Sequence, residues 1–195
     1  PSQQFDISKI DFDLLSREFA HTRRKNLLLR DLDELVNQQL SKMLFANPQR
    51  IDYYDRYQEI IDAYNAEQNR ATIEKTFMDL MELASSLDTE QQRYVREGFS
   101  SDEELSVYDL LFSENLTKQE IETIKKVSVD LLTKIKQQIA KLDHWTDKQE
   151  TKAIVDNLIR NTLWQELPNS YDVSDIQTYQ KKIYEYVYMR YPEVA

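Results

Sequence analysis

Glycine is almost absent from this chain, and its absence constrains the fold more than any other feature of the sequence. Gly98 is the only glycine in 195 residues, which also include four prolines and no cysteine. Hairpins and tight turns usually draw on glycine, whereas long helices joined by short polar links do not need it. The sequence therefore predicts an all-α protein, an irregular multi-helix bundle of about seven or eight helices with a long N-terminal helix.

Apolar residues recur at helical spacing along nearly the whole chain. The first stripe runs from Leu28 to Met43 and stops at Asn47-Pro48, where proline disfavours helix at the preceding residue. This break gives the expected boundary between a long N-terminal lead-in helix, residues 1–48, and a compact helical bundle, residues 49–195. Further stripes cover 53–64, 73–87, 121–142, 154–163 and 176–191.

Four segments open with a capping-box pattern, in which a Ser or Thr and a Glu or Gln three residues later satisfy each other's backbone N–H groups. They begin at Thr89, Ser101, Thr117 and Thr146. Gly98 then lies just past a short helix that begins near Thr89, where a left-handed residue lets the chain leave a helix without strain. We interpret the glycine as a helix stop and the acidic residues after Ser101 as a helix start.

The usual motifs of catalysis are missing from the sequence. One glycine excludes both the phosphate-binding loop and the dinucleotide fingerprint, because each needs several glycines. The only two histidines, His21 and His144, lie far apart, and neither belongs to a zinc-binding pair. Glu150 and Lys152 imitate a nuclease spacing, but they fall at a predicted helix start rather than on strands. We therefore expect no catalytic, cofactor-binding or metal-binding residue in this chain.

The charge of the chain is negative and uneven. The formal net charge is −10, and residues 77–122 carry 12 acidic residues against three basic ones. Net negative charge disfavours unspecific binding to nucleic acid. One basic group, the lysines of residues 125–141, is expected to form a solvated helix face. The other group is Arg23, Arg24, Lys25 and Arg30. It has the same expected structural role, and it is also the candidate contact with a DNA backbone.

Tyrosine is unusually frequent, with 12 residues in the chain. The segment YEYVYMRY, residues 184–191, alternates tyrosine as a strand would, yet its 3.6-residue apolar spacing favours a helix. Tyr184 and Tyr188 lie off that apolar stripe, so their face must meet another helix or a partner. The candidate partner-interface residues are Tyr184, Tyr188, Tyr191, Trp145 and Trp164. Packing inside a helical core is the alternative for each of them.

Most of the chain, about residues 51–192, resembles the C-terminal helical region of R (restriction) subunits of bacterial type I restriction-modification enzymes. One matching stretch is YYDRYQEIIDAYNAEQ, followed by FMDLMELASSLDTEQQRYVREGFSSDEELSVYDLLF. Another is LDHWTDKQETKAIVDNLIRNTLWQELPNSYD, and KKIYEYVYMRYP resembles the closing helix of the family. Phe99 replaces the usual leucine, Lys152 replaces the usual arginine, and His144 is an extra residue before the tryptophan.

The resemblance implies a parent subunit that translocates DNA with ATP and cleaves it at a distance from its recognition site. The nuclease and motor domains, with their ATP and Mg²⁺, would lie N-terminal to this chain, which begins with Pro rather than Met. The C-terminal helical domain is implied to be non-catalytic and to dock onto a methyltransferase core of modification and specificity subunits. Contact with the DNA backbone during translocation is the alternative, although the parent complex would bind most of the DNA.

The expected location is the bacterial cytoplasm. The chain has no cysteine, which fits a reducing compartment. No apolar run approaches the roughly 20 residues that a helix needs to cross a bilayer, so we expect no membrane contact.

Overall fold

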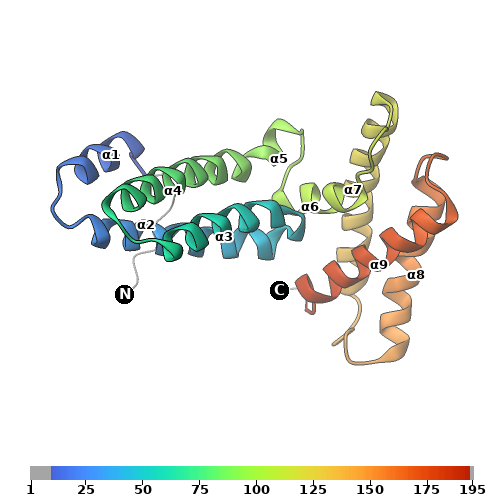
Figure 1. Ribbon diagram of the computed structural model, residues 1–195. Helices are drawn as coiled ribbons and strands as arrows, with labels where there is room; N and C mark the ends of the chain where they lie inside the picture. The colour runs from blue at the N-terminus through green and yellow to red at the C-terminus, as the bar shows by residue number, and fades with distance from the viewer. Residues whose placement is uncertain (1–9, 194–195) are drawn as a thin grey trace. The chain divides into compact units, whose positions relative to one another are not determined.

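The structure is a computed structural model that describes residues 10–193 (Figure 1). Within these residues it contains nine α-helices, one short 3₁₀ helix and no strand, which confirms the all-α prediction. The number of helices is slightly higher than expected, because Phe12–His21 forms a helix of its own before the long one. The chain divides into two compact units, unit 1 (Pro1–Arg96) and unit 2 (Glu97–Ala195).

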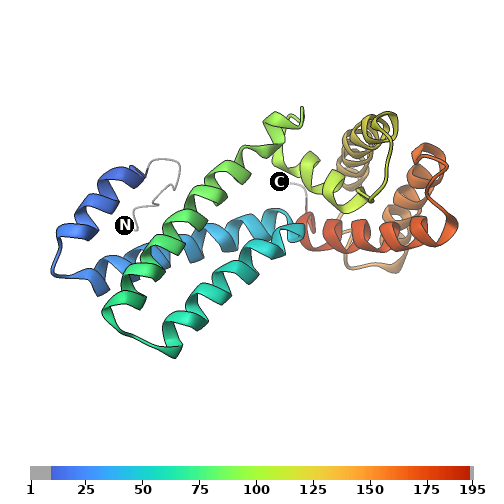
Figure 2. The ribbon, with the colours of Figure 1, turned by 45° about the horizontal axis from the view of Figure 1, so that its top comes forward.

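Unit 1 is built on three helices that pack along one another (Figure 2). Its elements are α1 (Phe12–His21), α2 (Lys25–Ala46), η2 (Pro48–Arg50), α3 (Ile51–Ala66), α4 (Arg70–Gln91) and α5 (Arg93–Arg96). As predicted, α2 ends at Asn47-Pro48, where Asn47 is extended and its side chain accepts a hydrogen bond from the Gln49 N–H. The expected division into a lead-in helix, residues 1–48, and a bundle, residues 49–195, of one domain stays a prediction. In the structure α2 packs against helices on the other side of that boundary.

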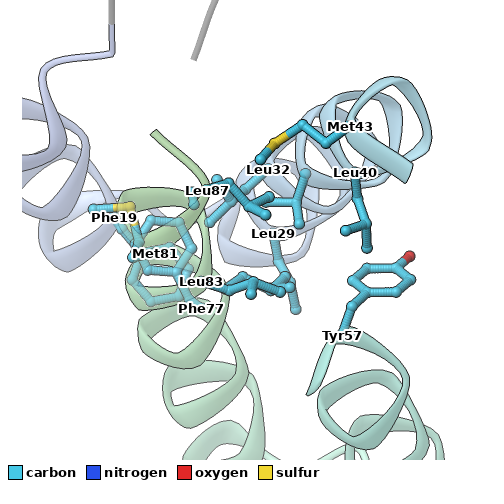
Figure 3. Close-up of a cluster of buried hydrophobic side chains, with 13 residues drawn as sticks. Phe19, Leu29, Leu32, Leu40, Met43, Tyr57, Phe77, Met81, Leu83 and Leu87 are labelled. Carbon is cyan, nitrogen blue, oxygen red and sulfur yellow. The ribbon is translucent and has the colours of Figure 1, made fainter. Parts of the chain in front are cut away.

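The core of unit 1 lies between α1, α2, α3 and α4 (Figure 3). Its buried residues are Phe19, Leu29, Leu32, Val36, Leu40, Met43, Tyr57, Phe77, Leu80, Met81, Leu83, Ala84 and Leu87. The ring of Phe19 stacks on that of Phe77 with centroids 3.7 Å apart, which attaches the short α1 to α4. Spacings of three and four residues put the apolar positions of α2 and α4 on one face of each helix.

A buried ion pair closes one end of unit 1. The Arg50 side chain is 3% exposed, and its Nε donates to Glu90 Oε1 at 3.0 Å. Arg93 Nε donates to the same Glu90 oxygen at 3.0 Å, so one carboxylate on α4 faces two guanidinium groups. These contacts hold the last turn of α4 against η2, and they explain why α4 continues past Thr89.

Unit 2 contains four helices that pack in sequence, with α9 returning to α6. They are α6 (Asp102–Leu111), α7 (Lys118–Ile139), α8 (Gln149–Glu166) and α9 (Val173–Arg190). Its fully buried residues include Leu105, Leu111, Ile124, Leu131, Ile135, Trp145, Val155, Ile159, Leu163, Ile183 and Val187. Residues 184–190 are helical, as the 3.6-residue spacing predicts.

Local signals predicted some helix ends correctly and others wrongly. Thr117 forms the full capping box with Glu120, and the Ser101 side chain caps α6. Gly98 has φ +85° just after α5, so its role as a helix stop is confirmed. The helix start expected at Thr89 is wrong, since α4 runs on to Gln91.

The helix start expected at Thr146 is also wrong. The N-cap of α8 is Lys148, and no side chain caps it. The Thr151 hydroxyl instead donates to the Trp145 carbonyl at 2.6 Å, which ties the first turn of α8 to the loop before it. That loop is held by the burial of Trp145 in the core, and a local capping pattern does not record this burial.

Candidate protein-interaction surface

Metal binding and membrane crossing find no support in residues 10–193. No group of three or more histidine, aspartate or glutamate side chains among them is placed to hold a metal ion. No described helix combines the length and the apolar character that a membrane span requires.

Three aromatic residues that the sequence singled out lie together in unit 2. The Trp145 ring lies 6.1 Å from that of Tyr184 and 5.7 Å from that of Tyr188, both edge to face. The two tyrosine rings are themselves 6.1 Å apart, one turn along α9. We call these three residues the Trp145 cluster. Edge-to-face contacts at such distances stabilise aromatic pairs beyond the area that they bury.

Within the cluster, Trp145 is a support and the tyrosines are the accessible part. Trp145 is completely buried, and its indole Nε1 donates to the carbonyl of Tyr191 at 2.6 Å. Tyr188 is 38% exposed and Tyr184 is half-buried. Burial raises the pKa of Tyr184, and the Asp156 carboxylate adds to this effect, so its hydroxyl stays protonated and able to donate.

A polar groove opens beside Tyr184, between α8 and α9. It has a volume of about 510 Å³. Its lining residues are Gln149, Lys152, Ala153, Asp156, Gln177, Gln180, Lys181 and Tyr184. Gln180 Nε2 donates to Asp156 Oδ1 at 2.9 Å, which fixes the two walls against each other. The other amides and the two lysines supply donors that suit carbonyl or carboxylate groups of a partner.

Sequence reasoning missed this groove, although part of its signal was readable. Gln177, Gln180, Lys181 and Tyr184 follow helical spacing, so they share one face of α9. The sequence alone does not show that Lys152 and Asp156 of α8 form the opposite wall.

The other two candidate interface residues, Tyr191 and Trp164, are not part of the Trp145 cluster. Tyr191 is 9% exposed and belongs to the core, where Lys136 Nζ lies 5.3 Å from its ring centroid. Burial raises the pKa of Tyr191, and the nearby Tyr186 and Glu103 raise it further. Trp164 is 50% exposed on α8, and within residues 10–193 no ring contact joins it to the Trp145 cluster. The structure therefore brings Trp145, Tyr184 and Tyr188 together and leaves Trp164 apart.

The basic group of unit 1 is only partly accessible. Lys25 Nζ bonds to Glu74 Oε1 at 3.1 Å and lies 4.6 Å from the Phe19 ring centroid. Its ammonium group therefore already interacts with residues of unit 1. Arg23, Arg24 and Arg30 are exposed, although Arg30 lies 3.9 Å from the Asp31 carboxylate. Three of the four candidate DNA contacts thus remain accessible.

The second basic group, expected to be simply solvated, is largely paired. Lys125 bonds to Glu97 at 3.1 Å, Lys134 to Glu166 at 2.6 Å, and Lys136 to Glu103. These partners are distant in sequence, which explains why a charge count along the chain did not reveal them. The acidic stretch 77–122 spans the division between the two units, and within it Glu97 pairs with Lys125 and Glu103 with Lys136.

One comparison with known proteins gives a match. A family model described as "Type I restriction enzyme HindI endonuclease subunit-like, C-terminal" matches residues 2–191. None of the curated proteins and none of the solved structures compared with the chain matches it. The match covers nearly the whole chain, including the first 50 residues, which carry none of the motifs of the resemblance.

Proposed function

The chain belongs to the family of C-terminal domains of type I restriction enzyme HindI endonuclease subunit-like proteins, and from this membership we propose that it is a non-catalytic assembly domain. It would join the endonuclease subunit to a methyltransferase core made of modification and specificity subunits, in the bacterial cytoplasm. ATP-dependent translocation and cleavage of DNA would belong to other parts of the parent subunit.

The observation that carries this proposal is the Trp145 cluster. Tyr184 and Tyr188 are accessible, yet their rings are held against a buried tryptophan that is itself bonded to the Tyr191 carbonyl. A side chain that is already fixed loses little conformational entropy on binding. Tyrosine and tryptophan are also enriched among the residues that contribute most to protein interfaces.

The polar groove between α8 and α9 supports the same surface. It lies beside Tyr184 and offers amide and ammonium donors from Gln177, Lys152 and Lys181. An aromatic anchor next to polar groups is the usual anatomy of a protein interface, where a buried centre is surrounded by a polar rim. We expect the partner to place an apolar group against the tyrosines and acceptor groups in the groove.

A binding experiment tests the proposal. The purified chain is mixed with its cognate methyltransferase core, without DNA, on a sizing column at moderate salt, and we expect the two to elute together. Tyr188→Ala should weaken the complex by about 1–2 kcal/mol, or roughly 5- to 30-fold in Kd, because it removes an anchor ring. Tyr54→Ala is the matched control, since Tyr54 is 40% exposed and lies in unit 1. Separate elution, or equal effects of the two variants, would contradict the proposal.

Contact with the DNA backbone is the alternative function, and it rests on the exposed side chains of Arg23, Arg24 and Arg30. Binding through phosphates weakens steeply and log-linearly with salt concentration. A triple substitution of these arginines by alanine, measured with duplex DNA across a salt series, would reduce both the affinity and the salt slope. A binding curve that the substitution leaves unchanged would exclude the alternative.

A further inference from the structure

The polar groove between α8 and α9 is a positive site on a negative chain. Two of its lining residues are lysines, Lys152 and Lys181, and one is acidic, Asp156. The chain as a whole has a formal net charge of −10. Among residues 10–193, no ion pair or hydrogen bond involves either ammonium group. The groove therefore contains two ammonium groups that lack an anionic partner among these residues.

A second groove in unit 2, along α7, has the opposite balance of charge. Its charged lining residues are Glu97, Glu122 and Asp130 against Lys125 and Lys126. Lys125 also pairs with Glu97 at 3.1 Å, so one of the two positive charges is already compensated. An anionic group of a partner is therefore attracted to the groove between α8 and α9 and not to the groove along α7.

The antiparallel course of α8 and α9 fixes the order of the groups along the groove. The ring of Trp145, which precedes α8, lies 6.1 Å from the ring of Tyr184 near the end of α9. Gln180, one turn earlier in α9, bonds to Asp156, which lies further along α8. Lys152 comes one turn before Asp156 on the same wall, so it lies at the end of the groove that carries Tyr184. The aromatic rings of the Trp145 cluster and an unpaired ammonium group are therefore neighbours.

Asp156 limits where an incoming anionic group can lie. Its Oδ1 accepts a hydrogen bond from Gln180, and this neutral amide does not cancel the negative charge. A second carboxylate beside Asp156 would be repelled, so only the lysines attract one. A nucleic-acid strand carries a phosphate about every 3.4 Å, and such evenly spaced charges would place one beside Asp156. A protein segment can place its carboxylates singly, so it suits this mixed lining better.

We propose that the groove binds an acidic segment of a partner protein, with an apolar side chain against Tyr184 and Tyr188 and carboxylates at Lys152 and Lys181. The identity of the partner, the methyltransferase core, rests on the proposed assembly function, whereas the chemistry of the segment rests on the groove. The chain carries an excess of negative charge, so an acidic segment placed elsewhere on it meets like charge. The two lysines therefore select both the segment and the position in which it docks.

The first experiment titrates the full chain with a capped peptide in which glutamates flank one phenylalanine, and follows the tyrosine rings by NMR. We expect saturable shifts of the Tyr184 and Tyr188 rings and none of the Tyr54 ring, which is 40% exposed in unit 1. A peptide with glutamine in place of each glutamate should bind roughly fivefold more weakly at low salt, and added salt should reduce this difference. The absence of saturable shifts, or equal binding of the two peptides, would overturn the proposal. A short DNA duplex that shifts the same rings at lower concentration would overturn it in favour of nucleic acid.

Paired substitutions assign the preference to the two lysines of the groove. Lys152→Met with Lys181→Met removes both charges, so the acidic peptide should bind no better than the glutamine peptide. Lys152→Arg with Lys181→Arg keeps both charges and should retain the preference. Lys118→Met with Lys126→Met is the matched control, since both lysines are exposed on α7 and the change in net charge is the same. Binding of the glutamine peptide reports that the groove is still formed. A preference that survives the loss of Lys152 and Lys181 would overturn their role.

Measuring the Kd of the same variants with the methyltransferase core separates the groove from the assembly function. We expect the methionine pair at Lys152 and Lys181 to raise the Kd roughly fivefold, and the control pair on α7 to leave it unchanged. If the complex forms and the two pairs behave alike, the assembly function stands and the acidic segment is overturned. If the parent chain forms no complex, the assembly function fails, while the peptide titration still decides the chemistry of the groove.

Discussion

The two units supply side-chain donors to carbonyls near their helix ends with different chemistry. Carbonyl groups in the last turn of a helix lack a partner within that helix. In unit 1, arginines add a second donor to carbonyls that already accept a backbone N–H, from Asn47 at Met43 and from Gln92 at Thr89. Arg50 Nη1 donates to the Met43 carbonyl at 3.4 Å at the end of α2, and Arg96 Nη2 donates to the Thr89 carbonyl at 3.0 Å at the end of α4.

In unit 2, neutral aromatic groups take this role at the ends of α6 and α9. The Tyr171 hydroxyl donates to the Leu111 carbonyl at 2.6 Å, and the Trp145 indole donates to the Tyr191 carbonyl at 2.6 Å. A buried guanidinium needs a counter-charge, whereas a buried indole or phenol does not. The two units should therefore respond differently to the loss of a charge.

The largest expected effect is the loss of the counter-charge in unit 1. Glu90→Ala leaves the buried guanidinium of Arg50 without its partner carboxylate. Removing one partner of a buried ion pair typically costs about 3–5 kcal/mol. We expect that loss in the free energy of unfolding of unit 1, measured by hydrogen exchange of the amides of α2 and α4.

The matched control for Glu90→Ala is an exposed ion pair on the same helix. Asp79→Ala breaks the bond between Lys75 and Asp79 on α4, where the Lys75 side chain is 75% exposed. Such pairs contribute about 0.5 kcal/mol or less. Both tryptophans, Trp145 and Trp164, lie in unit 2, so fluorescence reports that unit separately. Equal losses of stability in Glu90→Ala and Asp79→Ala would show that the burial of the Glu90 ion pair is unimportant for stability.

The next largest effect is expected in unit 2, from Trp145→Phe. The change removes the donor to the Tyr191 carbonyl and part of a fully buried side chain. An unsatisfied buried acceptor and a small cavity together cost about 2–3 kcal/mol. Denaturation followed by the remaining Trp164 should show this loss. Val155→Ala, a fully buried change on α8 without a lost hydrogen bond, is the comparison. A loss of stability no larger than that of Val155→Ala would show that the indole hydrogen bond does not contribute to the stability of unit 2.

The sequence predicted features that depend on local backbone chemistry. Asn47-Pro48 ends α2, and Gly98 takes a left-handed conformation, because the covalent structure of proline and glycine determines these preferences. It failed at Thr89, where a capping pattern lies inside a helix. The reason is the hydrogen bond that Glu90 accepts from Arg50, which lies 40 residues earlier in the chain.

The candidate site could be predicted only in part, for the same reason. The off-stripe positions of Tyr184 and Tyr188 correctly indicated a second face of α9, but Trp145 and Tyr191 prove to be core residues. An aromatic residue is equally suitable for a core and for an interface, so its burial depends on which helix packs against it. The sequence alone did not predict the polar groove, because α8 and α9 each supply one wall of it.

A smaller effect at alkaline pH is expected from Tyr171 of unit 2. Burial raises the pKa of Tyr171 above its ordinary value of 10.0. Above about pH 10 the unfolded chain loses this proton while the folded chain keeps it, so the stability from this group falls as pH rises and is complete below pH 10. Tyr171→Phe should cost about 1–2 kcal/mol at pH 7, since the Leu111 carbonyl loses its donor.

The same variant should lose less stability than the parent chain between pH 10 and 11, because it has no proton to release at that position. Stability is measured at each pH by denaturation, with fluorescence reporting unit 2. Burial also raises the pKa of Tyr53 and Tyr57 in unit 1, so the comparison is between variant and parent chain rather than between units. A pH dependence that Tyr171→Phe leaves unchanged would exclude Tyr171 as its source.

The smallest effect concerns the links between helices. Among residues 10–193, positive φ angles occur only at Gly98, Asn115 and His144, all in unit 2. Gly98→Ala should destabilise unit 2 by about 1 kcal/mol, since a left-handed conformation disfavours any residue with a Cβ atom. No atom lies within 4 Å of the added methyl group, so the cost is one of backbone conformation and not of a clash. Ser100→Ala, at an exposed neighbouring position, should change the stability by less than about 0.5 kcal/mol. Fluorescence-detected denaturation measures the stability of both variants. If Gly98→Ala and Ser100→Ala are equally stable, left-handed residues do not distinguish the links of unit 2 from those of unit 1.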